Sequence, residues 1–421
     1  MKCSGAGVVL CILPGLVYNG RVDPETLDAV ILKPGEELRP LRGDLWIYDN
    51  EIASRVSGMT PGTCVRILSH RGHFVASGYI NPRSKITVRI LSHDPHEAID
   101  RSLLQRRIEG ADRLRRSLRP ENRCYRMVYA EADRLPGLVI DRFDSHLVVQ
   151  ITTAGMERFK DDIFSILTAL HPRAVIVEKS ISGARGKEGL PDINRIVVDA
   201  GKRKAAWGRV RINGIRFNID FLNSQKTGFF LDQRDNYPLL QHIVEGEDVL
   251  DVFSYAGAWG LHARRYGARH VHFIEISQEN LELTRENVAL NGWDPLTFDY
   301  TAGDALGLLK EMSQQGVEKG VVILDPPAFV KSKHKLRDGL RGYKEINLRA
   351  LRMVRPGGFL ISCSCSFFLQ PRRFIQVIAE AAADARRAVK LIAFRGQPYD
   401  HSILLPLYQS EYLKCALFFV Y

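Results

Sequence analysis

The apolar positions divide the chain into three regions with different rhythms. From residue 28 to 97, short apolar runs such as "GTCVRILSH" and "HFVASGYI" alternate with turn-forming pairs such as Pro61-Gly62 and Asn81-Pro82. Short strands interrupted by turns of this kind are typical of a small β-barrel. The pattern therefore predicts a β-barrel domain over residues 28–97.

A second region, residues 98–204, mixes helical and strand patterns. It opens with a helical pattern over 101–119, which we expect to link two domains, and it contains a second helical pattern over 156–170. The apolar side of the first helix is formed by Leu103, Leu104, Ile108, Ala111 and Leu114. Strand patterns surround the second helix, and the glycine-rich stretch 182–192 is interpreted as a loop. Together these patterns predict a central α+β domain.

The third region, residues 205–421, alternates apolar strands with helical segments such as 277–290 and 342–354. Apolar runs joined by helical crossovers predict a parallel sheet that helices cover on both faces. The last two strand patterns, about 388–395 and 411–420, follow each other without a helix. We therefore predict an α/β, Rossmann-like domain whose seven-stranded sheet ends in an antiparallel edge.

The N-terminal segment 1–27 lies outside these patterns. Its stretch "GAGVVLCILPGLV" has the length of a signal-peptide core, but it contains Pro14 and no convincing cleavage site. We interpret it as a leader or as an over-long start. No segment approaches the roughly 18 apolar residues of a membrane span, so a membrane protein is not expected.

Positive charge is grouped along the chain. The formal net charge is +11, and residues 101–126 hold nine arginines against three acids. Residues 201–216 hold six basic residues and no acid, and residues 331–344 hold six against one. A solvated helix face explains any one cluster, but three clusters beside chemical motifs favour an RNA or DNA partner.

The seven cysteines are scattered and do not resemble a disulfide framework. We therefore expect reduced thiols and a cytoplasmic protein. Only Cys363 and Cys365 form a close pair, whereas a structural zinc site needs about four ligands. No metal site is predicted.

Acidic residues close three successive strands of the third region. Asp251 precedes a turn that contains Gly257, Glu275 ends the next strand, and Asp304 ends the strand after it. In such sheets ligands bind at the carboxyl ends of the strands. Glu275 can accept both ribose hydroxyls, and Asp304 can accept an adenine amino group. The ordered set predicts a site for adenosine, although each acid alone is more often a surface residue or a helix cap.

The fourth strand ends in "LDPPAF", residues 324–329. Two prolines after Asp325 form a rigid turn that directs the carboxylate and Phe329 towards one pocket. This arrangement suits a planar base that is hydrogen-bonded at its edge and stacked on an aromatic ring. The alternative is an ordinary strand-ending turn.

At these residues the sequence resembles the class I S-adenosylmethionine-dependent methyltransferases, and within them a family of 23S ribosomal RNA cytosine-5 methyltransferases. The resemblance rests on "NSQKTGFFLDQRDN", "LDVFSYAGAWG", "LDPPAFVKSK", "RGYKEINLRAL" and the S-C-S of "SCSCS". It covers the chain from about residue 28, where the barrel resembles a PUA domain that binds RNA. It implies S-adenosylmethionine as cofactor and 23S ribosomal RNA as partner, and it leaves a monomer and a homodimer open.

The resemblance and the motifs together give a set of candidate residues. For the cofactor these are Asp251, Phe253, Tyr255, Gly257, Glu275, Asp304 and Gln233. For the RNA they are Lys226, Arg234, Pro326, Pro327, Phe329 and Lys331. For catalysis they are Cys365 and Asp325.

The resemblance implies a covalent mechanism, because carbon 5 of cytosine is a poor nucleophile until a thiolate adds at carbon 6. Cys363 is extra to the family pattern, and its place deeper in the strand predicts a core residue. Cys365 is expected at the strand's end as the nucleophile, activated locally, for example by the cofactor's sulfonium charge. The alternatives are a guanine or exocyclic-amine methyltransferase without a covalent intermediate, an RNA-binding protein, and an NAD-linked oxidoreductase.

Overall fold

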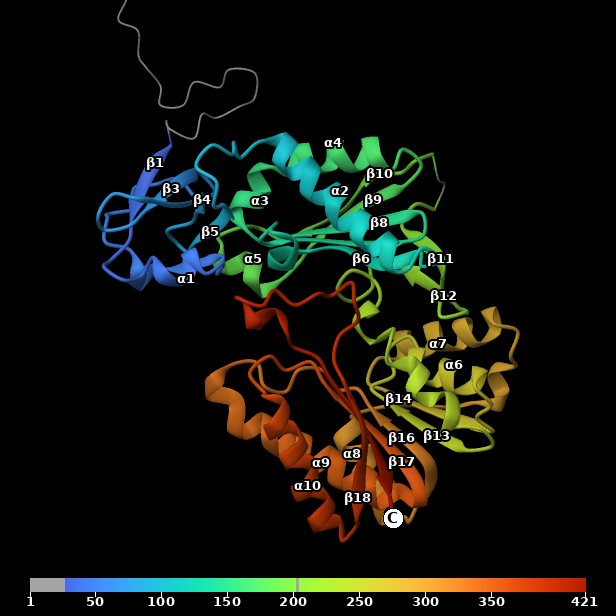
Figure 1. The fold of residues 1–421 in the computed structure, drawn as a ribbon. Helices are drawn as coiled ribbons and strands as arrows, with labels where there is room; N and C mark the ends of the chain where they lie inside the picture. The colour runs from blue at the N-terminus through green and yellow to red at the C-terminus, as the bar shows by residue number, and fades with distance from the viewer. Residues whose placement is uncertain (1–26, 202–203) are drawn as a thin grey trace, which may run out of the picture.

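The computed structural model describes residues 27–201 and 204–421, whose elements form three domains along the chain (Figure 1). Residues 1–26, on which the leader interpretation rests, lie outside the described residues. The domain boundaries at 97/98 and 204/205 stay predictions.

The N-terminal domain is one five-stranded sheet in the order β1-β3-β4-β5-β2 around its own core. Its elements are β1 (Asp28–Ile31), α1 (Leu38–Leu41), β2 (Trp46–Tyr48), β3 (Cys64–Leu68), β4 (Phe74–Ile80) and β5 (Ile86–Ser92). Side chains of β3 alternate between buried and half-buried, as a strand with one face on a core requires. The small β domain is confirmed.

The central domain is an α+β unit, as predicted. Its sheet has the strand order β10-β9-β8-β7-β6. Its elements are α2 (Arg101–Leu118), β6 (Cys124–Tyr129), β7 (Leu138–Phe143), β8 (His146–Ile151), α3 (Ala154–Arg158), α4 (Lys160–Leu170), β9 (Val175–Ser180), α5 (Gly183–Lys187) and β10 (Ile193–Val198).

Three details of the central domain differ from prediction. Helix α2 is not a free linker, because it packs on β6 and α4, and Leu114 on its predicted apolar side is 49% exposed. The expected single helix over 156–170 is divided into α3 and α4. The expected loop 182–192 contains α5, because the Ser182 hydroxyl accepts the amide hydrogen of Arg185 and caps a helical turn.

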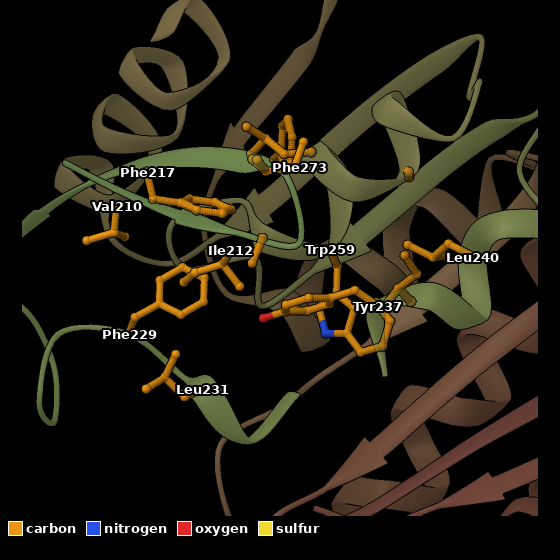
Figure 2. Close-up of a cluster of buried hydrophobic side chains, with 14 of the residues drawn as sticks. Val210, Ile212, Phe217, Phe229, Leu231, Tyr237, Leu240, Trp259 and Phe273 are labelled. Carbon is orange, nitrogen blue, oxygen red and sulfur yellow. The ribbon is translucent and has the colours of Figure 1, made fainter. Parts of the chain in front are cut away.

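A hairpin joins the central domain to the third domain. Strands β11 (Trp207–Ile212) and β12 (Ile215–Asp220) pair around Asn213-Gly214, whose φ angles of 45° and 85° suit a two-residue hairpin turn. Val210, Ile212 and Phe217 enter the core (Figure 2). Arg209, Arg211 and Arg216 occupy alternate, exposed positions of this hairpin.

The third domain contains the predicted seven-stranded sheet, in the order β15-β14-β13-β16-β17-β19-β18. Five strands are parallel, and β19 is antiparallel to both its neighbours. Its strands are β13 (Asp248–Val252), β14 (His270–Glu275), β15 (Asp299–Ala302), β16 (Lys319–Leu324), β17 (Val354–Ser364), β18 (Val389–Arg395) and β19 (Lys414–Val420). Its helices are α6 (Ala258–Arg265), α7 (Gln278–Leu290), α8 (Ala305–Gln314), α9 (Leu336–Met353) and α10 (Pro371–Ala385).

Helices bury both faces of this sheet. Leu261 of α6 and Leu281 of α7 belong to one core cluster, and Ile346 of α9 and Phe374 of α10 belong to another. The strand order reverses at β13, which lies between β14 and β16. Loops that follow the parallel strands therefore meet at one edge, where such folds bind ligands.

The connection between β18 and β19 leaves the third domain and contacts the other two (Figure 1). Leu404 packs against the core of the N-terminal domain. The Tyr129 hydroxyl of the central domain donates to the Ser410 carbonyl over 3.2 Å. The three domains are thus joined around the segment that leads into β19.

Candidate active site

The loop between β13 and α6 has an unusual backbone. Phe253 and Tyr255 have φ angles of 64° and 50°, and Gly257 follows at 78°. Left-handed backbone at non-glycine residues costs free energy and gathers at ligand sites. A Cβ on Gly257 would lie 2.5 Å from Thr284 Cγ2, so only glycine fits between this loop and α7.

Asp251, at the end of β13, is fully buried. Its Oδ2 accepts the amide hydrogen of Gly260 over 2.8 Å, and its Oδ1 has no hydrogen-bond partner. Burial, with a smaller contribution from Asp325 and Glu275, raises the pKa of Asp251 to about 8. Because buried polar atoms are normally hydrogen-bonded, the unpaired oxygen marks a place where a ligand can donate.

Glu275 supports the strained loop and keeps capacity for a ligand. Its Oε2 accepts the Tyr255 amide over 2.9 Å, and its Oε1 accepts the Ser277 amide over 3.2 Å. Asn280 Nδ2 also donates to Oε1, over 3.4 Å, so of the roughly four acceptor positions of the carboxylate the one left free is on Oε2, where a ribose hydroxyl can donate.

Asp304 is exposed and caps α8, since its Oδ2 accepts the Gly307 amide over 2.9 Å. Asp304 is therefore a helix cap. Its contact with an adenine amino group stays a prediction.

Asp325 lies partly buried at the end of β16, where two side chains hold its carboxylate. Its Oδ1 accepts from Gln233 Nε2 and its Oδ2 accepts from Trp259 Nε1, each over 3.0 Å. Burial raises the pKa of Asp325 to about 6 despite these donors. The structure thus brings Gln233, predicted for the cofactor, to the proposed catalytic acid. Trp259 was not predicted, although its indole N–H within "SYAGAWG" was a signal.

The two cysteines near the end of β17 differ as predicted. Cys363 is fully buried in the core, whereas Cys365 is half-buried. The Cys365 Sγ lies 4.0 Å from the carbonyl oxygen of Pro326 in the turn after β16. Burial, helped by the charges of Asp325 and Asp232, raises the pKa of Cys365 to about 12. The thiol therefore lies beside the turn that carries Asp325, but it is protonated at neutral pH and must lose its proton before it can act as a nucleophile.

A hydroxyl network fixes the backbone on both sides of Cys365. The Tyr343 hydroxyl of α9 lies 2.9 Å from the hydroxyls of both Ser364 and Ser366. Ser366 in turn accepts the Val330 amide over 3.0 Å. This network ties the end of β17 to the Asp325 turn, and the sequence alone did not reveal Tyr343.

The residues predicted to contact the base lie around the same turn. Phe329 packs on Tyr343 with 4.8 Å between ring centroids, and 6.4 Å separates it from Phe253. Pro326 is buried and Pro327 is exposed. Phe329 therefore has a packing role, and stacking on a base stays a prediction.

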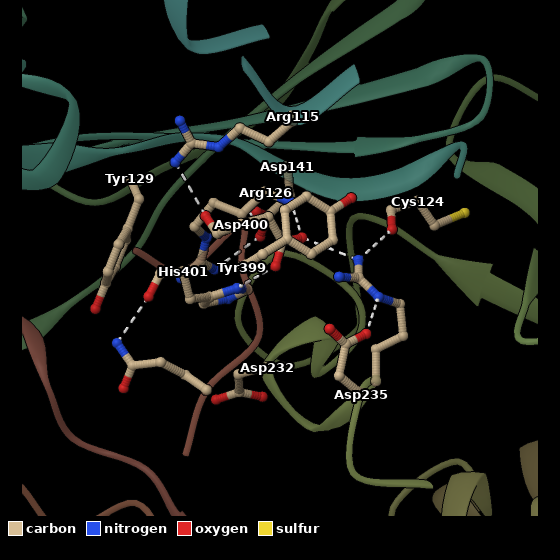
Figure 3. Close-up of polar contacts among 12 residues, drawn as sticks. Arg115, Cys124, Arg126, Tyr129, Asp141, Asp232, Asp235, Tyr399, Asp400 and His401 are labelled. Carbon is tan, nitrogen blue, oxygen red and sulfur yellow. Dashed lines mark hydrogen bonds and ion pairs between the residues drawn. The ribbon is translucent and has the colours of Figure 1, made fainter. Parts of the chain in front are cut away.

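The basic residues predicted for RNA divide into two kinds. Lys226 and Lys331 are exposed, as a phosphate contact requires. Arg234 lines a cleft between the central and third domains but is 2% exposed, and it pairs over 2.9 Å with Asp400, which Figure 3 labels. Its ion pair inside the protein argues against a phosphate contact, although its Nη2 has no hydrogen-bond partner, and the predicted contact of Arg234 stays a prediction.

Comparison with known proteins identifies the family. Residues 30–93 match a PUA-like domain, and residues 193–395 match an S-adenosylmethionine-dependent methyltransferase. The "Ribosomal RNA large subunit methyltransferase I" of Shewanella denitrificans is 36% identical over 91% of this chain and 97% of that protein. The protein of the same name from Shewanella frigidimarina is 37% identical over the same shares.

The chain belongs to the ribosomal RNA large subunit methyltransferase I family. It is therefore an S-adenosylmethionine-dependent methyltransferase with a PUA-like domain, and the oxidoreductase and non-enzyme alternatives are excluded.

Solved structures agree with the fold of this methyltransferase. A Streptococcus mutans protein described as SAM-dependent superposes with a TM-score of 0.78, over 93% of this chain and 100% of that one. A methyltransferase complexed with SAH gives 0.80 over the same shares. Both are 17% identical, so they support the fold alone.

The residues at the sheet edge fit S-adenosylmethionine, which supplies a methyl group on a sulfonium when bound. The loop from Phe253 to Gly257 has left-handed backbone of the kind that gathers at ligand sites. The unpaired Oδ1 of Asp251 and the carboxylate of Glu275 are acceptors for donor groups.

In the described part of the chain, no helix is long and apolar enough to cross a membrane.

Proposed function

We propose that this methyltransferase transfers the methyl group to carbon 5 of a cytosine in 23S ribosomal RNA, through a covalent bond between Cys365 and carbon 6. The observation that carries the proposal is the half-buried Cys365 thiol beside the Asp325 turn. The names of the relatives supply ribosomal RNA of the large subunit as substrate class.

The residues around Asp325 suit the first step of this reaction. A thiolate at Cys365 gives an electron pair to carbon 6, and electron density moves towards carbon 5 and the N3 edge of the base. Since the pKa of Asp325 is raised to about 6, a share of its carboxyl is protonated near neutral pH. It can then donate a proton to N3 and neutralise the charge that develops there.

After methyl transfer, a base must take the proton from carbon 5. The carbon 6–sulfur bond then breaks, and its electron pair returns to Cys365. The Tyr343 network keeps the sulfur in one place through both steps, because it holds Ser364 and Ser366 on either side.

Exposed cations support the RNA partner. Lys226 lies beside the cofactor loop, because the neighbouring Gln225 amide donates to the Tyr255 hydroxyl. Lys331, Lys333 and Lys335 are exposed directly after the Asp325 turn. Such cations neutralise phosphates, so we expect affinity for RNA to fall steeply with salt.

The test uses a substrate that traps the covalent step. Large-subunit ribosomal RNA transcribed with 5-fluorocytidine has no proton to lose at carbon 5, so the adduct persists after methyl transfer. We expect a protein–RNA band on denaturing gels with wild-type protein and with Cys363→Ala, and none with Cys365→Ala. Methylation of ordinary RNA should be lost only in Cys365→Ala, while S-adenosylmethionine binding by calorimetry is retained in both variants.

The same experiment distinguishes the cytosine-5 reaction from methylation of guanine or of an exocyclic amine. A guanine or exocyclic-amine methyltransferase needs no thiol, since the nitrogen attacks the methyl group directly. Methylated guanosine in nuclease digests, formed equally by Cys365→Ala and wild-type protein, would overturn the cytosine-5 proposal.

A further inference from the structure

A buried lysine holds the backbone that carries the thiol of the candidate site. Lys414 is the first residue of β19, where it stands opposite Ser364 in the register with β17, and it is 3% exposed. Its Nζ donates to the carbonyl oxygens of Ser366 and Tyr412, each over 2.6 Å. The amine is thus anchored to the carbonyl of the residue that follows Cys365.

Carbonyl groups do not neutralise a lysine. Within the described residues Lys414 has no carboxylate at ion-pair distance, whereas other buried cations, such as Arg126 and Arg234, are paired with aspartates. A buried, unpaired amine is costly, and it binds its proton less tightly than an exposed one. Burial indeed lowers the pKa of Lys414 to about 8, with Cys365 and Glu411 acting in the opposite sense.

We propose that Lys414 is a general base that takes the proton of the Cys365 thiol and then, as an ammonium group, stabilises the thiolate for attack on carbon 6. The inference rests on the proposed cytosine-5 reaction. The sulfur–hydrogen bond breaks, the proton joins the Lys414 nitrogen, and the sulfur pair is free to form the bond to carbon. When that bond breaks later, the thiolate again faces an ammonium group.

The negative charges near Cys365 disfavour its thiolate, so a positive group is needed to stabilise it. Asp325, Asp232 and Tyr343 surround the thiol, and the two carboxylates oppose the thiolate. Lys414 is the one cation among the groups that act on Cys365. In its neutral form the Lys414 amine can take the thiol proton, and once protonated it is the positive charge beside the thiolate, which the two carboxylates cannot supply.

The test measures the thiol directly, without RNA. The rate at which iodoacetamide alkylates Cys365 is followed against pH by peptide mass spectrometry. Lys414→Gln keeps a donor for the carbonyls but removes the basic amine. We expect at least a tenfold slower alkylation of Cys365 at pH 8 and a midpoint moved to higher pH.

Two controls accompany this variant. Lys179→Gln removes another buried lysine, which donates to the Ser224 carbonyl and has its pKa lowered to about 8 by burial. It should leave the Cys365 profile unchanged. Alkylation of Cys64, a half-buried thiol in the N-terminal domain, should be the same in all proteins. An unchanged Cys365 profile in Lys414→Gln would overturn the inference.

A second variant covers loss of folding. If Lys414→Gln melts early or does not bind S-adenosylmethionine, Lys414→Arg decides, because a guanidinium keeps the charge but accepts no proton. Its Cys365 alkylation midpoint should be no higher than in wild type, because the fixed charge still stabilises the thiolate. Its single-turnover rate of methyl transfer should fall several-fold, because the guanidinium cannot take the thiol proton, and a wild-type rate would reject Lys414 as proton acceptor. A shifted thiol profile in a protein that makes no methylcytidine would instead refute the proposed function alone.

Discussion

Asp251 combines a cost in stability with the binding role predicted for it. Its carboxyl is fully buried, one oxygen has no partner, and the pKa is raised to about 8 mainly by burial. The folded protein therefore binds this proton more tightly than the unfolded chain does. The resulting stability is complete below the unfolded pKa, near 4, and is lost as the pH rises through about 8.

We expect Asp251→Asn to stabilise the ligand-free protein at pH 8 by about 3–4 kcal/mol relative to its effect at pH 5, because the amide never ionises. The same variant should weaken S-adenosylmethionine binding at least tenfold. Urea unfolding at the two pH values and calorimetry measure both effects. An equal stability difference at pH 5 and pH 8 would contradict the burial argument.

At the scale of elements, α9 and the end of β17 form a single unit through one hydroxyl. Tyr343 is fully buried and connects to Ser364 and Ser366, which flank Cys365. Helix α9 thereby fixes the backbone on both sides of the thiol. The Gly342 side of the same turn packs against the Phe329 ring, which fixes the helix to the Asp325 turn.

Tyr343→Phe should lower the free energy of unfolding by about 1–2 kcal/mol, because two buried serine hydroxyls lose a partner. The methyl-transfer rate should fall at least fivefold while the affinity for S-adenosylmethionine is retained. Single-turnover kinetics and urea unfolding test this. The matched control is Tyr300→Phe, whose buried hydroxyl has no partner, and it should leave both quantities nearly unchanged.

At the scale of the whole molecule, Asp400 joins the central and methyltransferase domains (Figure 3). Its Oδ2 accepts from the Arg126 amide and from Arg234 Nη1, each over 2.9 Å, and its Oδ1 lies 3.0 Å from His401 Nδ1. Although burial alone would raise the pKa of Asp400, His401 and Arg234 hold it well below the usual range. This contribution to stability is present above the unfolded pKa and is lost as the pH falls.

We expect Asp400→Asn to lower the free energy of unfolding by about 3 kcal/mol at pH 7, since it leaves Arg234 buried with less compensation. The loss of stability caused by Asp400→Asn should shrink below pH 4. There the unfolded wild-type chain gains a proton at Asp400 that the folded protein does not bind. The control is Asp144→Asn, which alters an exposed pair with Arg123 and should cost less than about 1 kcal/mol. Urea titrations compare the variants, and equal losses in both would refute the role of Asp400.

The sequence by itself determined the three domains, the seven-stranded sheet and the order of the residues at its carboxyl edge. These features follow from periods of two and 3.6 residues and from short motifs, which are local. It also ranked the two thiols, since depth along a strand can be counted. The predictions that were wrong, such as a loop at α5 and a buried Leu114, concern positions where helix caps and packing between domains determine the structure.

Only the tertiary structure decided which side chains act on Asp325 and Cys365. Trp259, Tyr343 and Lys414 come from α6, α9 and β19, and no spacing in the sequence announces that they meet. The same holds for Arg234, whose ion-pair partner Asp400 lies 166 residues away in the sequence. Periodicity sets local structure, whereas burial and pairing depend on residues that only folding brings together.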